Sequence, residues 1–270
     1  MSDGAVKLLA RDMGLAYFRP DRKDRQVTVA VKHLNLVVYE GEFVCIVGPS
    51  GCGKSTFLNA VTGLLPINAG ELLLNGAPVK GPGPDRAQVF QAPYLLPWRT
   101  VRGNVMYGME SQKVPKSEMA ERADHYINLV GLRAFANHYP HELSGGMQQR
   151  VNLARALAIN AELILLDEPF AALDAQTREF MQEELLRIWR ATRKTALFVT
   201  HQINEAVYLA DRVLVFSSRP GYVREEIPIN LPRPRELRLK RTPEFLEYEE
   251  HIWELIEQEV KQSATMGVVA

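Results

Sequence analysis

The sequence has few cysteines, no excess of charge of either sign and no long hydrophobic run, and each absence excludes a class of protein. Among 270 residues only Cys45 and Cys52 are cysteines, which excludes a disulfide framework and favours a reducing compartment. The 32 basic residues equal the 32 acidic ones, so no overall charge draws the chain to nucleic acid. No segment approaches the roughly 18 apolar residues of a transmembrane helix, and the N-terminus does not resemble a signal peptide. We therefore expect a soluble protein that reaches a membrane only through a partner.

What the chain does contain is the composition of an ordinary globular protein, with 46% apolar and 24% charged residues. Short apolar runs recur along it, each bounded by turn residues or by helical patterns. Such runs indicate strands buried on both faces of a mainly parallel sheet, and hence an α/β fold. The runs are Phe43 to Val47, Ala87 to Phe90, Leu163 to Leu166, Ala196 to Thr200 and Arg212 to Phe216.

Two regions of the chain depart from this pattern. Residues 7–18 and 27–38 predict an antiparallel β region at the N-terminus, with a further strand at 72–74 before a turn signal. Between Gln91 and Ser144 the strand-like runs disappear, and the spacing of apolar residues over 116–130 predicts a helix. We interpret this interval as a helical subdomain inserted into the sheet domain.

The tail of the chain has a character of its own. Leu231-Pro-Arg-Pro-Arg excludes regular structure, whereas Thr242 and Pro243 suit the N-cap and first position of a helix. The apolar residues expected on one face of this helix are Phe245, Tyr248, Ile252, Leu255, Ile256 and Val260. We therefore divide the chain into a core subdomain (1–92 and 159–230), a helical subdomain (93–158) and a C-terminal extension with an amphipathic helix (231–270).

The strongest local motif is Gly48-Pro-Ser-Gly-Cys-Gly-Lys-Ser55, which stands between a predicted strand and a helical run. It fits the pattern GxxxxGK[ST] of a phosphate-binding loop, and this setting disfavours a mere glycine-rich turn. Glycines let several backbone N–H groups point at one phosphate, Lys54 adds a positive charge, and the Ser55 hydroxyl suits Mg²⁺. The residues expected to contact a nucleotide are Gly48, Pro49, Ser50, Gly51, Cys52, Gly53, Lys54, Ser55 and Thr56.

Polar residues follow three other predicted strands, at the ends where parallel sheets bind ligands. They are Gln91, the pair Asp167-Glu168 and His201. Any one of them alone is more often structural, so the prediction depends on their joint occurrence with the phosphate loop. Phosphoryl transfer needs positioning and charge neutralisation, and we therefore expect Ser55, Gln91 and Asp167 to hold Mg²⁺. We expect Glu168 to act as the general base for water, Gln91 to orient that water, and His201 to donate to the γ-phosphate.

A second glycine-rich segment, Leu143-Ser-Gly-Gly-Met-Gln-Gln-Arg150, precedes another helical pattern. Ser144 is a natural N-cap, and Gly145-Gly146 leaves the first N–H groups of the helix uncovered. Taken alone, the segment indicates only a capped helix start. The same N–H groups also form a second anion site, for which one chain by itself has no evident use.

These motifs resemble, in kind and in order, those of the ABC (ATP-binding cassette) ATPases. GPSGCGKS is similar to the Walker A motif of that family, LILLDEP to Walker B, LSGGMQQR to the signature motif and FAALD to the D-loop. The resemblance extends from about Leu8 to Arg219 and implies a P-loop NTPase cassette that binds ATP and Mg²⁺ and hydrolyses ATP. It also implies that two copies pack head to tail. The partner copy's ATP would then be closed in by Ser144, Gly145, Gly146 and Gln148.

The resemblance further implies an aromatic residue that stacks on adenine, and Tyr17 stands where that residue is expected. Phe18 is adjacent, and Tyr17 could equally be packed within a strand. Both alternatives stay open at this point.

Two narrower features resemble the importer ATPases for nitrate, alkanesulfonates, taurine or bicarbonate. They are the segment APYLLPWRTV after Gln91 and the sequence Arg219-Pro-Gly followed by Leu231-Pro-Arg-Pro-Arg. This resemblance implies two membrane permease subunits that contact a groove near Leu95 to Trp98, and an extracytoplasmic solute-binding protein that acts indirectly. It also implies a peripheral place on the cytoplasmic face of the inner membrane. As an alternative, Trp98 could simply belong to the core of the helical subdomain.

A non-transport ABC ATPase of translation or DNA maintenance is the alternative function. Such proteins have two cassettes in one chain or carry long coiled-coil insertions. The interval from Gln91 to Ser144 is too short for a coiled coil. The basic residues of the tail precede an acidic helix and lack interleaved aromatics, so we expect no nucleic-acid partner.

Overall fold

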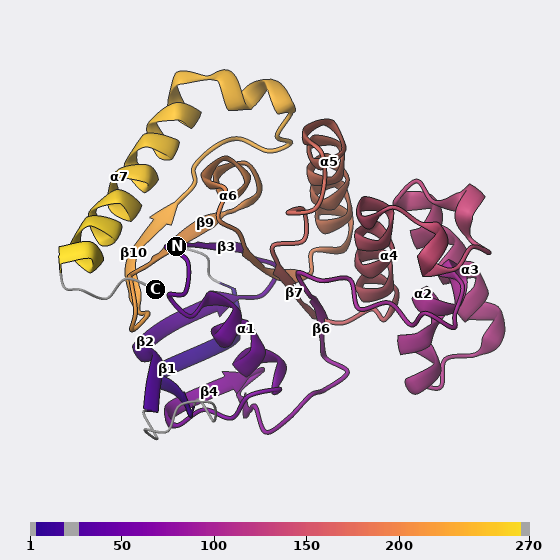
Figure 1. Cartoon of the computed structure of the whole chain (residues 1–270), viewed down its shortest axis with the longest axis horizontal. Helices are drawn as coiled ribbons and strands as arrows, with labels where there is room; N and C mark the ends of the chain where they lie inside the picture. Colours follow the sequence, from indigo (N-terminus) through magenta and orange to yellow (C-terminus); the bar gives the residue numbers. More distant parts are fainter. Residues whose placement is uncertain (1–3, 19–26, 266–270) are drawn as a thin grey trace. The chain divides into compact units, whose positions relative to one another are not determined.

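The computed structural model describes residues 4–18 and 27–265 (Figure 1). The chain forms two compact units, one of residues 1–83 and 195–270 and the other of residues 84–194. These limits differ from the subdomain boundaries expected at 93 and 158, because β6 (Arg86–Val89) and β7 (Leu163–Asp167) belong to the same unit as the helices between them. Hydrogen bonds join the starts of the two strands: Glu162 and Leu163 donate their N–H groups to the carbonyl of Asp85.

The first unit contains the predicted antiparallel sheet. Its strands are β1 (Val6–Phe18), β2 (Val27–Tyr39), β4 (Ala69–Leu74) and β5 (Ala77–Pro78), in the order β2-β1-β4-β5. Strand β1 pairs with β2 on one side and with β4 on the other, both antiparallel. One face of β1 is buried through Leu8, Ala10, Met13 and Leu15, and this face follows the alternation expected of a half-buried strand.

The same unit contains a second group of strands, ordered β10-β9-β3-β8. The central strands β3 (Phe43–Val47), β8 (Thr195–Val199) and β9 (Arg212–Phe216) are parallel, as predicted, and all five residues of β3 are buried. Strand β10 (Val223–Pro228) runs antiparallel to β9 and was not predicted. Helix α1 (Lys54–Thr62) follows β3, and the short helix α6 (Ile203–Leu209) follows β8.

The C-terminal extension packs back onto this unit through helix α7 (Pro243–Thr265), which Figure 1 shows in yellow alongside α6 and β10. The N–H of Phe245 donates to the hydroxyl of Thr242, which confirms the predicted N-cap. Phe245 and Ile252 are fully buried, but Val260 is 50% exposed, so its predicted place on the buried face was wrong. The acidic residue Glu259, only 4% exposed, is buried instead.

The Pro/Arg-rich segment before α7 has no regular structure, as predicted, yet a buried cation orders it. The guanidinium of Arg235 donates to the carbonyls of Val207, Tyr208 and Ala210 at 2.7–3.1 Å, at the C-terminal end of α6. A cation is stabilised there because the carbonyls at the end of a helix carry partial negative charge. Burial is the main cause that lowers the pKa of Arg235 to about 10. This segment is therefore an ordered attachment of the extension.

The second unit pairs β6 and β7 in parallel and adds helices. Helices α2 (Val101–Ser111), α3 (Lys116–Leu129) and α4 (Gly145–Ala158) pack against one another, with 3-10 turns at Arg133–Phe135 and Pro140–Glu142. Helix α5 (Ala175–Thr192) follows β7. The α/β class, the parallel core strands and the helical insertion are thereby confirmed. No helix within residues 4–18 and 27–265 combines the length and the apolar character needed to cross a membrane.

Candidate functional site

The phosphate-loop motif connects β3 to α1 in the first unit. Gly53 is the N-cap of α1 and has φ 104°, and a Cβ at this position would lie 2.8 Å from the carbonyl oxygen of Ala30. Glycine is therefore required there, because a side chain would be both strained and blocked. No side chain caps α1, and its first turn contains no acidic residue. The positive end of the helix is thus left for an anion.

Lys54 is held at the centre of this loop. Its Nζ donates to the carbonyls of Gly48 (2.8 Å) and Pro49 (2.9 Å), and it contacts the Cys52 sulfur at 3.6 Å. The Lys54 side chain, 7% exposed, carries its charge inside the curl of backbone. Cys52 is 1% exposed, and burial raises the pKa of its thiol although Lys54 opposes the rise. The Cys52 sulfur is therefore enclosed within the loop, beside Lys54 and Gly48.

His201 lies in the same unit, at the matching end of a neighbouring strand. Strand β8 is parallel to β3, with Val199 opposite Ile46, and the N–H of Thr200 donates to the Ile46 carbonyl at 3.2 Å. The Thr200 hydroxyl donates to the buried carboxylate of Glu205 at 2.6 Å, which orders the turn after the strand. His201 itself is exposed. The structure thus brings the phosphate loop and His201 to one edge of the sheet, as the sequence predicts.

Tyr17 lies near the end of β1, opposite Thr28 of β2, and is half-buried. Its place in the strand agrees with the packing alternative, while its remaining exposure leaves the ring available to a ligand. The segment 19–26 that follows lies outside the described residues. Stacking of Tyr17 on adenine stays a prediction.

The second unit brings Gln91 and Glu168 together. Gln91 follows β6 and Glu168 follows β7, and the Gln91 Nε2 donates to the Glu168 carboxylate at 3.3 Å. Glu168 has φ 46°, a conformation that is uncommon for any residue except glycine and that marks strained positions at functional sites. Asp167, the last residue of β7, is 7% exposed. The predicted general base and the amide predicted to orient the attacking water are therefore neighbours.

Helix α4 supplies residues that sequence reasoning missed. The amides of Gln149 and Asn152 both donate to the carbonyl of Phe90 at 3.1 Å, and Arg155 donates to the carbonyls of Pro93 and Tyr94 at 3.0 Å. These contacts fix the backbone on both sides of Gln91. Burial lowers the pKa of Arg155. The signal in the sequence was the spacing of these three polar residues, which places them on one face of the helix. The structure shows that this face turns inward.

The start of α4 carries the signature-like segment. Ser144 is the N-cap, and its hydroxyl accepts from the N–H of Met147 at 3.3 Å, as predicted. Ser144 and Gly145 are exposed, and a Cβ on Gly145 would meet nothing within 4 Å. The first turn contains no acidic residue. The Gln148 Nε2 donates to the carbonyls of Pro140 and Leu143, so this amide orders the preceding loop.

The segment after Gln91 exposes large aromatic side chains. Trp98 is 71% exposed and Tyr94 is 68% exposed, which excludes Trp98 from the core of this unit. The backbone between them is nevertheless fixed, because the fully buried amide of Asn104 accepts from the Leu96 N–H and donates to its carbonyl. An ordered segment that exposes aromatic rings is typical of an interface.

Comparisons with known proteins agree on the family. Residues 31–171 match the family described as ABC transporter. An uncharacterized ABC transporter ATP-binding protein of Methanocaldococcus jannaschii is 52% identical over 234 residues, which cover 87% of this chain and 86% of the relative. The nitrate import ATP-binding protein NrtD of Synechocystis is 46% identical over 238 residues, which cover 86% of this chain and 90% of the relative. A dimeric structure of the ATP-binding cassette MJ0796, bound to ADP and Pi, matches with a TM-score of 0.74 at 33% identity, over 83% of this chain and 100% of that chain.

Proposed function

The chain belongs to the ABC transporter family, and on this premise we propose that it is the ATP-hydrolysing subunit of an importer for a small anion, with nitrate as the first candidate. The chain is an ATPase, as the family's ATP-binding subunits are. The observation that carries the choice of nitrate is the 46% identity to NrtD over 86% of this chain. Alkanesulfonate, taurine and bicarbonate are further candidates, because the APYLLPWRTV segment resembles that whole branch.

In the proposed reaction, the phosphate loop binds the triphosphate and Lys54 neutralises its charge. Mg²⁺ takes hard oxygen donors as ligands. In this proposal the donors are Ser55 at the exposed start of α1 and Asp167 at the end of β7. Gln91 is a further ligand. Mg²⁺ supplies charge neutralisation at the phosphates when it is bound. The described residues contain no cluster of three or more His, Cys, Asp or Glu for a metal, so phosphate oxygens complete the proposed ligand set.

Glu168 is the general base in this proposal. Its carboxylate takes a proton from the attacking water, the new P–O bond forms at the γ-phosphorus, and the bond to the ADP oxygen breaks. The strained backbone of Glu168 and its hydrogen bond with Gln91 support this role, because both restrict where the carboxylate points. His201, exposed at the end of β8, donates to the γ-phosphate.

We further propose that two copies act together, with the start of α4 in one copy closing the ATP held by the other. Support comes from the exposed Ser144 and Gly145, which leave the helix N-terminus open to an anion, and from the dimeric state of the cassette MJ0796. Closure of the dimer on ATP, and its opening after hydrolysis, would drive the membrane subunits.

The proposed membrane partners are two permease subunits that contact the segment from Leu95 to Trp98, on the cytoplasmic face of the membrane. The exposed rings of Tyr94 and Trp98 support this contact. An extracytoplasmic solute-binding protein acts through the permease, and nucleic acid is no partner in this proposal.

The test is anion-stimulated hydrolysis in the membrane complex. The chain is co-expressed with its permease subunits, and ATP turnover is measured with the cognate binding protein loaded with nitrate, taurine, an alkanesulfonate or bicarbonate. Nitrate should stimulate turnover most. Glu168→Gln should lower stimulated turnover by about 10²–10⁴-fold, the usual contribution of a general base, with ATP binding retained. Lys54→Ala is the matched control that loses ATP binding.

Two outcomes would contradict the proposal. Turnover that no anion stimulates, in a protein that does not purify with a permease, would favour the non-transport ABC ATPase. Undiminished turnover in Glu168→Gln would remove Glu168 from its assigned role.

A further inference from the structure

The second half of α7 is attached to the turn formed by residues 217–221, which follows β9. Glu259 of α7 is 4% exposed, and its Oε2 accepts from the N–H of Ser218 at 2.7 Å and from the Ser218 hydroxyl at 3.0 Å. Its Oε1 forms an ion pair with Arg224 of β10 at 2.6 Å. A buried carboxylate is stable only where donors surround it, and this one has three.

The 217–221 turn in turn presses against the phosphate loop. Arg219 donates its Nε–H to the carbonyl of Gly51 at 3.1 Å. A Cβ on Gly221 would lie 2.1 Å from the Cys52 carbonyl oxygen, and a Cβ on Gly48 would lie 2.8 Å from the Phe216 carbonyl oxygen. The turn thus contacts the backbone of the loop at Gly51 and Cys52, while Gly48 packs against Phe216 at the end of β9.

The turn is also fixed to β2, which leaves it few ways to move. The N–H of Gly221 donates to the Ala30 carbonyl at 2.9 Å, and the Gly221 carbonyl accepts from Lys32 at 3.0 Å. The Tyr222 N–H closes the turn on the hydroxyl of Ser217 at 3.0 Å. These hydrogen bonds hold the end of the turn at Gly221, and Glu259 holds its first part at Ser218.

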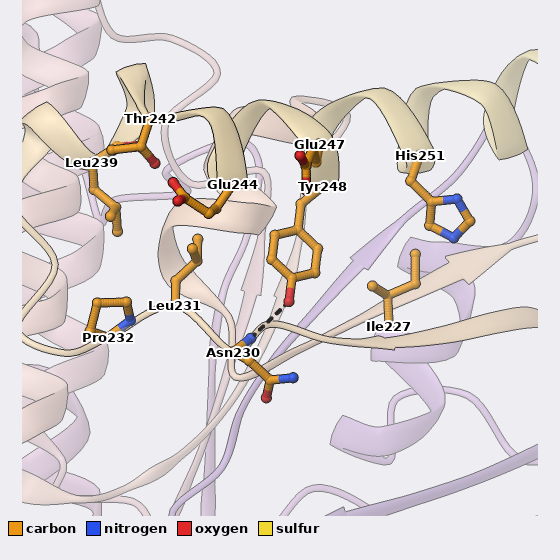
Figure 2. Close-up of a pocket in the computed structure, with 10 residues that line it drawn as sticks. All are labelled: Ile227, Asn230, Leu231, Pro232, Leu239, Thr242, Glu244, Glu247, Tyr248 and His251. Carbon is orange, nitrogen blue, oxygen red and sulfur yellow. Dashed lines mark hydrogen bonds between the residues drawn. The ribbon is translucent and has the colours of Figure 1, made fainter.

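The first half of α7 is attached differently. A cavity of about 710 Å³ lies between this half and the chain from Ile227 to Pro232, and Figure 2 shows the residues that line it. The Tyr248 side chain crosses the cavity, where its hydroxyl accepts from the Asn230 N–H at 3.2 Å. The cavity reaches His251, whose Nε2 lies 2.7 Å from the Glu225 carboxylate. The hydrogen bonds that connect α7 to the turn beside the phosphate loop are therefore those of Glu259 with Ser218.

We propose that α7 positions the phosphate loop, with Glu259 holding Ser218 so that Arg219 and Gly221 keep the backbone at Gly51 and Cys52 in its anion-binding form. This inference rests on the proposed nucleotide binding of the loop. Glu259 touches no reacting atom and is a positioning residue. Its effect falls on nucleotide affinity, because the N–H groups of the loop bind phosphate only when they converge.

The test is titration of the purified full-length chain with a fluorescent ATP analogue, which yields Kd and the number of sites separately. Glu259→Ala and Arg219→Ala should each raise Kd by about 3- to 10-fold, the effect expected from loss of one or two hydrogen bonds. The Kd of the double variant should be no higher than that of the more affected single variant, because both changes break the same connection. Glu254→Ala, an exposed carboxylate on the same helix, is the matched control and should leave Kd unchanged.

The two measured quantities separate positioning from general stability. A merely structural Glu259 would lower the number of sites through unfolding and leave the Kd of the folded fraction unchanged, and that result would overturn the proposal. If Glu259→Ala does not fold, Arg219→Ala and Glu259→Gln carry the test, and an unchanged Kd in both also overturns it. Failure of the proposed function would look different, since the unaltered chain would then show no ATP affinity that Lys54→Ala removes.

Discussion

Helices α1, α4 and α5 each begin after a loop that carries a family motif, but their first turns are built differently. Helix α5 is capped by the carboxylate of Asp174, which accepts from the Thr177 N–H at 3.0 Å, and this hydrogen bond lowers the pKa of Asp174. Helix α4 is capped by the neutral hydroxyl of Ser144, and α1 has no side-chain cap. None of the three helices has an acidic residue in its first turn, so the difference lies in the cap itself.

We interpret the difference as one between a helix whose start is closed by a negative charge and two helices whose starts are predicted to bind an anion. A carboxylate at the N-cap stabilises a helix and cancels the positive end of its dipole at the same time. The chain uses this cap at α5 and avoids it at both predicted phosphate-binding ends. Exchange of the caps is therefore the direct way to test the comparison.

The largest effect is expected from Ser144→Asp, which gives α4 the cap of α5. Aspartate caps a helix as well as serine does, so the melting temperature should stay the same and each monomer should still bind ATP. Hydrolysis should fall by about 10²-fold or more, because a negative charge now stands where the partner's γ-phosphate is to be bound. Steady-state turnover measures this. The reverse exchange, Asp174→Ser, is the control and should leave turnover within about 2-fold; equal losses in both variants would contradict the comparison.

A smaller effect is expected from Asp174→Ala, which leaves α5 uncapped. The melting temperature should fall by a few degrees, because the N–H of Thr177 loses its partner. ATP affinity, measured by the same titration as above, should not change. A lowered affinity would mean that the cap of α5 also serves the nucleotide.

An effect confined to high pH is expected at the opposite end of α5, where Lys194 follows the C-cap residue Arg193. Its Nζ donates to the Asn160 side chain and to the Ala161 carbonyl, and burial is the main cause that lowers the pKa of Lys194 from 10.5 to about 8. Because the unfolded chain holds this proton up to higher pH, the free energy of unfolding should rise between pH 8 and 10.5. Lys194→Gln should remove this rise. Urea unfolding at several pH values measures it, and parallel curves for the two proteins would contradict the assignment.

Much of the fold could be predicted because buried parallel strands are short continuous apolar runs. Strands β3 and β9 have the predicted limits, and helix α3 begins at the predicted residue. Strand β10 was missed because Val223 to Pro228 is largely polar and pairs at an edge of the sheet. Gln149, Asn152 and Arg155 were missed for a related reason, since a polar side chain that binds a distant carbonyl has the same sequence pattern as one that faces water.

The chemistry of the candidate site was determined by the sequence alone, because a phosphate loop and the helix start at Ser144 are local structures whose residue types follow from backbone geometry. The partners of the buried charges were decided only by the tertiary structure. Arg235 at the end of α6 and Glu259 against Ser218 are separated from their partners by tens of residues, and no local pattern encodes which carbonyl or N–H will meet them. A long-range hydrogen bond depends on how the elements pack, and that packing is what attaches α7 to the phosphate loop.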